Sequence, residues 1–195
     1  MMITLEEARA ILSPFLERIE SCIASAIEEY NKMDAQTRSK FKKRTKANII
    51  NDFMAFNAAT ELEGLPGLLF SRRHQTFSVF IGDSFQLRFK KLDYRLRPSN
   101  IPTRRIVQLM NQTQAQLPDM PSPVTHVIAG YVWNDLQTAI KDVYIICPRG
   151  QYNEWELRIA AVKSPEVSSA GEISEASNPP SRRVYPKEKT NDLDK

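Results

Sequence analysis

The chain has 195 residues, of which 42% are hydrophobic and 26% charged, and its formal net charge is +4. This composition is typical of a globular protein and excludes a membrane-embedded or wholly disordered one. A domain of this size buries roughly 70% of the surface of its unfolded chain, so it needs neither a metal ion nor a disulfide for stability.

The two cysteines, Cys22 and Cys147, each lie among apolar residues, in SCIAS and YIICP. We expect both to be buried free thiols, as in a reducing compartment. The N-terminal sequence, MMITLEEARA, is acidic and amphipathic and does not resemble a signal peptide. No stretch approaches the roughly 18 continuous apolar residues of a membrane-spanning helix. These features predict a protein of the cytoplasm, or of the nucleus in a host that has one, that does not associate with membranes.

Helical periodicity begins at the N-terminus. Thr4 has capping-box spacing to Glu7, and apolar residues then recur every three or four positions as far as Tyr30. Pro14 interrupts this stripe, so either one long helix kinks there or a second helix begins at Ser13.

A further helix is expected in the next segment. Asp34 is a suitable cap, and the helical pattern ends near Glu63, before the sequence GLPG. The expected core side of this helix is formed by Phe41, Ile49, Phe53 and Phe56.

A β-hairpin is predicted over residues 75–92, where QTFSVFI and FQLRFKKL flank the turn residues GDS at 82–84. A two-residue loop would set Phe77 opposite Arg88. A three-residue loop instead places six apolar residues on one face. The predicted pairs are Ile81 with Phe85, Val79 with Leu87, and Phe77 with Phe89. The outer face would then consist of Ser78, Phe80, Gln86 and Arg88.

The remaining elements are a third helix, from Thr103 to about Gln116, and three strands. THVIAGYVW and KDVYIICP are apolar on both faces, which is typical of central strands that are covered on each side. Gly130 within the first of them indicates a bulge or a close backbone approach. NEWELRIAAV alternates, with inward positions Trp155, Leu157 and Ile159.

These elements predict an α+β fold. Two N-terminal helices, a β-hairpin, a third helix and a C-terminal three-stranded antiparallel meander would form one antiparallel sheet covered by helices. From Ser164 onward the chain is rich in Ser, Glu, Pro and Lys and has almost no large apolar residues, so it cannot offset its ordering entropy by burial. We predict a single domain over residues 1–163 and a disordered tail over residues 164–195.

Basic charge is concentrated in the middle of the chain. Residues 32–105 hold sixteen Lys and Arg against six Asp and Glu, whereas residues 1–31 are net acidic, at −4. The first cluster, at the start of the second predicted helix, consists of Arg38, Lys40, Lys42, Lys43, Arg44 and Lys46. Because cations at a helix N-terminus oppose its macrodipole, binding of a polyanion explains this cluster as well as a solvated lysine-rich face does.

The second cluster consists of Arg88, Lys90, Lys91, Arg95 and Arg97, followed by Arg104 and Arg105. Arg88 and Lys90 share the predicted outer face of the hairpin with Phe80 and Gln86. Cations beside an aromatic ring and an amide on a sheet are groups that bind single-stranded nucleic acid. Phe80 alone is better explained by packing under the third helix, whereas contact with an anion explains the whole set.

Signals for catalysis are weak. The chain has no glycine-rich phosphate loop, no nucleophile elbow and no zinc-ligand spacing around His74 and His126, so we expect no cofactor or metal and assign no catalytic residue. Asp83 could form a nuclease-like metal site only together with Glu61, Glu63 or Asp93. Metal-free RNA cleavage would need one of the two histidines close to other polar groups.

Three functions remain open. The first is a non-enzymatic protein that binds nucleic acid, or another polyanion such as an acidic protein, through residues 38–46 and 88–105. The second is a nucleic-acid-cleaving toxin or defence nuclease, as in toxin–antitoxin or phage-defence systems. The third is a protein–protein interaction subunit, such as an antitoxin or adaptor, with a protein partner or a second copy of itself.

Overall fold

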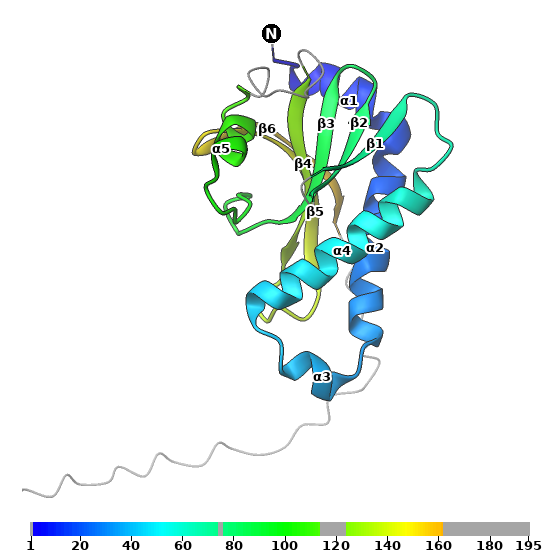
Figure 1. Cartoon of the computed structure of the whole chain (residues 1–195), viewed down its shortest axis with the longest axis vertical. Helices are drawn as coiled ribbons and strands as arrows, with labels where there is room; N and C mark the ends of the chain where they lie inside the picture. The colour runs from blue at the N-terminus through cyan, green and yellow to red at the C-terminus, as the bar shows by residue number, and fades with distance from the viewer. Residues whose placement is uncertain (1, 74–75, 114–123, 162–195) are drawn as a thin grey trace, which may run out of the picture. The chain divides into compact units, whose positions relative to one another are not determined.

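The computed structural model describes residues 2–73, 76–113 and 124–161 (Figure 1). All of them belong to one compact unit, Met1–Lys163. The remaining unit, Ser164–Lys195, lies outside the described residues, so the disordered tail stays a prediction. The elements, in chain order, are α1 (Leu5–Leu12), a 3₁₀ turn (Ser13–Phe15), α2 (Leu16–Lys32), α3 (Ala35–Ser39), α4 (Lys43–Glu61), β1 (Leu68–Arg73), β2 (Thr76–Ile81), β3 (Phe85–Lys91), α5 (Arg104–Met110), β4 (Thr125–Trp133), β5 (Ile140–Arg149) and β6 (Tyr152–Ala161).

The α+β class is confirmed, and the described strands form one six-stranded sheet in the order β1-β2-β3-β4-β5-β6. Five strands were expected; β1 was missed because LLFSRR does not alternate. The fully antiparallel arrangement is wrong at one pair, since β3 and β4 run parallel from Phe85–Thr125 to Lys91–Tyr131. A parallel pair requires a crossover of a dozen or more residues, and the segment between β3 and β4, which carries α5, provides it.

The three-residue hairpin loop is confirmed. Ile81 pairs with Phe85 and Val79 with Leu87. The expected pair of Phe77 with Phe89 does not form, because the β2–β3 ladder ends at Val79–Leu87 while β2 stays paired with β1 as far as Thr76. The two strands therefore separate next to α4.

The N-terminal helices follow the expected caps, with one break more than expected. Thr4 and Glu7 form the capping box, and the turn that contains Pro14 separates α1 from α2. Asp34 caps α3, but this helix ends at Ser39 and α4 begins only at Lys43. The Ser39 hydroxyl donates a hydrogen bond to the Gln36 carbonyl oxygen, a contact that competes with continuation of the helix.

The main core lies between the sheet and helices α1, α2 and α4. On α4 it is formed by Ile50, Met54 and Ala58, which are fully buried and spaced four residues apart. Phe56, expected on this side, is 63% exposed. The other residues expected there, Phe41, Ile49 and Phe53, are partly buried against the core.

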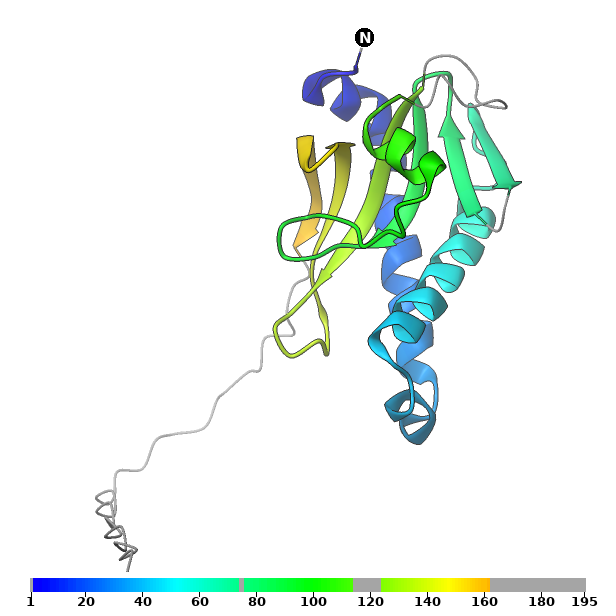
Figure 2. The same ribbon diagram turned by 60° about the vertical axis from the view of Figure 1, so that its left-hand side comes forward.

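The other face of the sheet has a smaller core. Leu92, Ile128, Val132 and Ile146 pack there with Met110 at the end of α5. Figure 2 shows α2 and α4 along one face of the sheet and α5 over the other. The expectation that the first two strands of the meander, β4 and β5, are covered on both faces is thus confirmed.

Three further findings concern single features of the chain. Cys22 and Cys147 are free and buried, as expected, and burial raises the pKa of each thiol to about 12. Trp155 and Leu157 are buried, and Ile159 is partly buried against the core. No helix among the described residues is both long enough and apolar enough to span a bilayer.

Candidate nucleic-acid interface

The first basic cluster spans α3, the following loop and the first turn of α4. Lys42 is the N-cap of α4, and the first turn of this helix contains no acidic residue. Four cations of the cluster are exposed, and none of them forms an ion pair with another described residue: Lys40, Lys42, Lys43 and Arg44. Lys42, Lys43 and Arg44 lie at the positive end of the α4 macrodipole, which repels each of these cations, whereas Lys40 is the C-cap residue of α3.

The other two cations of this cluster have structural partners. Arg38 Nε donates to the Met33 carbonyl oxygen at 3.0 Å, and its guanidinium lies 5.8 Å from the Tyr30 ring centroid. Lys46 Nζ lies 3.9 Å from the centroid of a Trp133 ring. It lies 5.3 Å from that of Tyr30, and it donates to the Gln137 carbonyl oxygen at 3.1 Å. Arg38 and Lys46 therefore tie this end of the molecule together rather than face a ligand.

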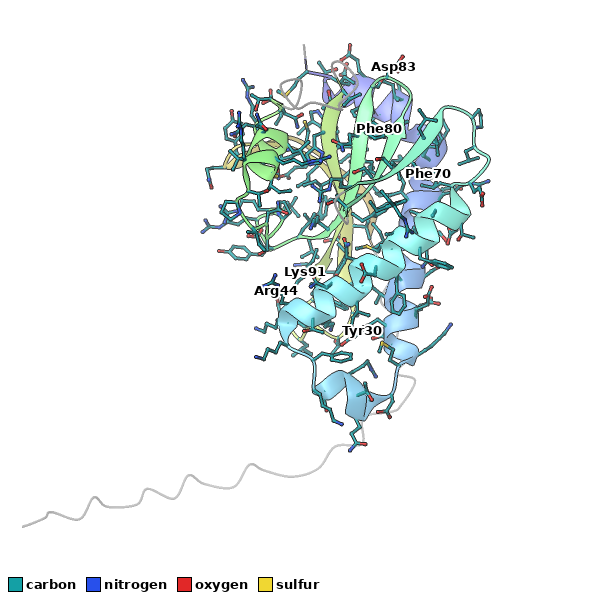
Figure 3. The ribbon with its side chains drawn as sticks, viewed as in Figure 1. Tyr30, Arg44, Phe70, Phe80, Asp83 and Lys91 are labelled. Carbon is teal, nitrogen blue, oxygen red and sulfur yellow. The ribbon has the colours of Figure 1, made fainter. Side chains whose placement is uncertain are left out.

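Lys91, at the end of β3, joins the first cluster. Its charge lowers the pKa of Lys46, and the charge of Lys43 lowers the pKa of Lys91, although burial is the larger cause in both cases. Figure 3 shows Lys91, at the end of β3, and Arg44, at the start of α4, on neighbouring elements. We define the basic surface as the five residues Lys40, Lys42, Lys43, Arg44 and Lys91.

The hairpin face expected to be exposed is covered instead. Gln86 is 2% exposed and Arg88 is 8% exposed, while Phe80 and Lys90 are half-buried. The cause is the crossover to the parallel strand β4, which brings α5 and the loop before it over this face. The Gln112 side chain, just after α5, links this segment to β4: its amide nitrogen donates to the carbonyl oxygen of His126, and its amide oxygen accepts from the backbone N–H of His126. These four hairpin residues therefore do not form an open platform for bases.

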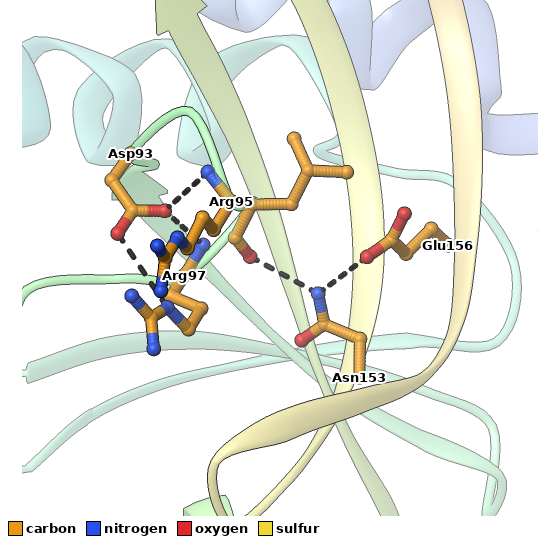
Figure 4. Close-up of polar contacts among 6 residues, drawn as sticks. Asp93, Arg95, Arg97, Asn153 and Glu156 are labelled. Atoms are coloured by element: carbon orange, nitrogen blue, oxygen red, sulfur yellow. Dashed lines mark hydrogen bonds and ion pairs between the residues drawn. The ribbon is translucent and has the colours of Figure 1, made fainter.

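The loop after β3 is held rigidly and presents an aromatic ring. Asp93 Oδ1 accepts hydrogen bonds from the backbone N–H groups of Arg95 and Arg97, both at 2.8 Å (Figure 4). The second carboxylate oxygen of Asp93 lies 3.6 Å from Arg97 Nε. Leu96 adopts the left-handed backbone conformation, with φ 55°, which turns the chain at this point of the loop. The Asn153 side chain holds this turn by donating a hydrogen bond to the Leu96 carbonyl oxygen at 3.2 Å.

Tyr94, at the tip of this loop, is 79% exposed, with the exposed Arg95 guanidinium 5.3 Å from its ring centroid. Tyr94 is three positions after Lys91 in the chain, so their Cα atoms are at most about 11 Å apart. Sequence reasoning missed Tyr94; its position between two cations, Lys91 and Arg95, was the available signal. Arg97, by contrast, is held by Asp93.

Arg104 and Arg105 lie at the start of α5, where Thr103 caps the helix. Arg104 is exposed and Arg105 half-buried. Burial lowers the pKa of Arg88, and the charge of Arg105 adds to this effect, so the two cations lie near each other on the covered side of the sheet. The second predicted cluster is thus divided: Lys91 belongs to the basic surface, whereas Arg88 lies beneath α5 and Arg105 in the first turn of that helix.

The residues considered for nuclease chemistry do not form a site. Asp83 and Asp93 lie beyond opposite ends of β3, so roughly 20 Å of extended strand separates them. Among the described residues there is no group of three or more His, Cys, Asp or Glu side chains that could hold a metal ion. His74 lies outside the described residues.

His126 is 1% exposed and has no access to a substrate. Burial, together with the charge of Arg88, lowers its pKa from 6.5 to about 3, while hydrogen bonding with the Gln86 backbone acts in the opposite direction. The unfolded chain therefore takes up a proton at this ring before the folded chain does. The stability that the neutral ring contributes is complete above about pH 6.5 and is lost as the pH falls toward 3.

We expect protonation of His126 to contribute strongly to the loss of stability at acidic pH. Between about pH 6.5 and pH 5 the free energy of unfolding of the wild type should fall with a contribution from His126 of up to about 1.4 kcal/mol per pH unit. His126→Gln should remove that contribution. Urea unfolding at several pH values measures both slopes. Equal slopes for the two proteins would show that His126 is not held neutral.

Comparison of the chain with family models, with curated proteins and with solved structures finds no match. A function for this protein therefore has to come from its own residues.

Proposed function

We propose that the protein is a non-enzymatic, cytoplasmic nucleic-acid-binding protein that uses the basic surface. The observation that carries this proposal is the position of Lys42, Lys43 and Arg44 at the N-terminus of α4, without an acidic residue in its first turn. Lys91 adds a fourth cation from a strand that ends nearly fifty residues later in the chain. Two distant segments thus contribute charge of one sign to one place.

A structural role does not explain this arrangement. Each cation in the first turn of a helix costs about 0.3–1 kcal/mol through the macrodipole, and these side chains form no compensating ion pair within the described residues. Phosphate groups reverse the balance because each one neutralises a cation and releases condensed counterions.

Tyr94 and Arg95 favour single-stranded nucleic acid. An exposed ring accepts a base by stacking, worth about 1–3 kcal/mol per base, when nearby cations hold the phosphates. The Asp93 contacts fix the loop before any ligand arrives, so little entropy is lost on binding. A duplex offers no unstacked base to such a ring.

The double variant K43Q/R44Q separates binding from folding. Its affinity for a short single-stranded oligonucleotide should fall by roughly 10-fold or more, since it loses two phosphate contacts. Its free energy of unfolding should rise by about 0.5–2 kcal/mol, since two cations no longer oppose the α4 macrodipole. Fluorescence anisotropy measures the first quantity and urea unfolding the second.

The matched control is R9Q/K141Q, which removes two exposed cations on α1 and β5. It should bind within about twofold of the wild type, because neither residue belongs to the basic surface. Equal losses in the two double variants would mean that net charge alone governs binding. Poly-glutamate should compete poorly; full competition would favour an acidic protein as the partner.

A further inference from the structure

Arg88 is a buried cation without a counter-ion in the described part of the chain. It is 8% exposed, and its guanidinium forms no ion pair or hydrogen bond with another described residue. Lys90, two residues later on the same face of β3, is half-buried and forms no ion pair with any residue that the structure describes. A buried unpaired charge costs several kcal/mol, so a fold retains one only where something compensates it.

The charges around Arg88 increase this cost. Burial lowers its pKa to about 10, with a further contribution from Arg105. Burial and the charge of Arg88 together lower the pKa of Lys90. His126, across the β3–β4 ladder from Gln86, is neutral and supplies no negative charge. All the charged neighbours of Arg88 in these contacts are therefore cationic.

A cavity of about 90 Å³ opens beside the two cations. It exists because the β2–β3 ladder stops at Val79–Leu87 and the strands separate. Its walls are Asn51 and Ala55 of α4, Thr76 and Phe77 of β2, and Arg88, Phe89 and Lys90 of β3. The space is large enough for several water molecules or one tetrahedral oxyanion, and too small for a nucleoside.

We propose that this cavity is a binding site for a phosphate group. Arg88 offers the planar pair of N–H donors that matches two phosphate oxygens, Lys90 offers a point charge, and the Asn51 amide offers a neutral donor. Two cations match the double charge of a phosphate better than the single charge of a carboxylate. The site is separate from the basic surface, and it stands whether or not that surface binds nucleic acid.

Inorganic phosphate is the first probe. The melting temperature of the full-length protein should rise with the logarithm of phosphate concentration at constant ionic strength, and isothermal titration calorimetry should give one site. Phosphate also stabilises proteins without binding a site, so the R88M variant provides the baseline. At each phosphate concentration the melting temperature should therefore rise more in the wild type than in R88M, and K90M should show a rise between the two. Equal rises in all three proteins would overturn the proposal.

Two further variants protect this test. N51A keeps both cations, so this variant tests the site even if R88M fails to fold. It should weaken phosphate binding several-fold, because it loses the Asn51 amide donor. Unchanged phosphate binding in N51A would contradict the role assigned to Asn51. D119N removes the acidic residue in 114–123, which lies outside the described residues. It should bind phosphate as the wild type does, whereas a gain in affinity would identify Asp119 as the counter-ion and overturn the proposal.

The source of the phosphate is tested with oligonucleotides. A 5′-phosphorylated strand that binds more tightly than its 5′-hydroxyl counterpart, in wild type but not in R88M, identifies a nucleic-acid end as the ligand. Equal affinity, with inorganic phosphate still bound, identifies a free phosphate. K43Q/R44Q should retain the response to inorganic phosphate, so failure of the nucleic-acid proposal and failure of the phosphate site give different results.

Discussion

Replacing Gly130 with alanine should destabilise the protein by about 3 kcal/mol or more. A Cβ atom at this position would lie 2.4 Å from the Lys90 carbonyl oxygen and 2.6 Å from Leu92 Cγ. Gly130 is paired with Lys90 in the parallel β3–β4 ladder, at the centre of the sheet, so neither strand can move aside without disrupting its neighbours. Thermal unfolding followed by circular dichroism measures the effect.

Gly82→Ala is the matched control. Gly82 lies in the hairpin turn with φ 51°, and a Cβ atom there would meet nothing within 4 Å. The free energy of unfolding of this variant should fall by only about 1–2 kcal/mol, which is the cost of placing an alanine in the left-handed backbone conformation. A Gly130→Ala protein as stable as Gly82→Ala would show that β3 and β4 do not approach as closely as the ladder requires.

Neutralising the exposed cations at the start of α4 should nearly abolish nucleic-acid binding. The variant K40Q/K42Q/K43Q/R44Q loses up to four phosphate contacts, which is on the order of a 100-fold loss of affinity for a single strand at about 0.1 M salt. The fold should be retained, since all four side chains are exposed and form no ion pair with another described residue. Anisotropy titration measures the affinity, and urea unfolding checks the fold.

The charge-matched control lies in the C-terminal segment. R182Q/R183Q/K187Q/K189Q removes the same number of cations from residues 164–195. It should bind within a few-fold of the wild type, because the proposal assigns binding to the basic surface. If this control loses as much affinity as the α4 variant, binding belongs to the overall charge of the chain.

Local patterns in the sequence were sufficient to predict most elements of the sheet. The hairpin register followed from alternation, because a shift by one residue would have turned Val79 and Leu87 away from the core. The close approach at Gly130 is likewise confirmed. The parallel β3–β4 pairing was not predictable in this way, since it depends on how the chain crosses over with α5 and not on either strand alone.

The candidate site was likewise predictable only in part. Counting charges along the sequence located the cations, but it did not show which of them are exposed, because exposure depends on what covers each face of the sheet. Arg88 lies on the hairpin's outer face as expected and is nevertheless buried by the crossover. Lys46 belongs to the basic run 38–46 at the start of α4, yet its ammonium group packs on the ring of Trp133, a residue far along the chain. Such long-range contacts are not visible in a local pattern.

The salt dependence of binding tests the central proposal most directly. For a single strand, the logarithm of the affinity should fall against the logarithm of salt concentration with a slope of about −0.7 for each phosphate that is neutralised. Five contacts from the basic surface predict a wild-type slope of about −3.5 and a slope near −0.7 for K40Q/K42Q/K43Q/R44Q. A wild-type slope close to zero, or the same steep slope in both proteins, would contradict binding at this surface.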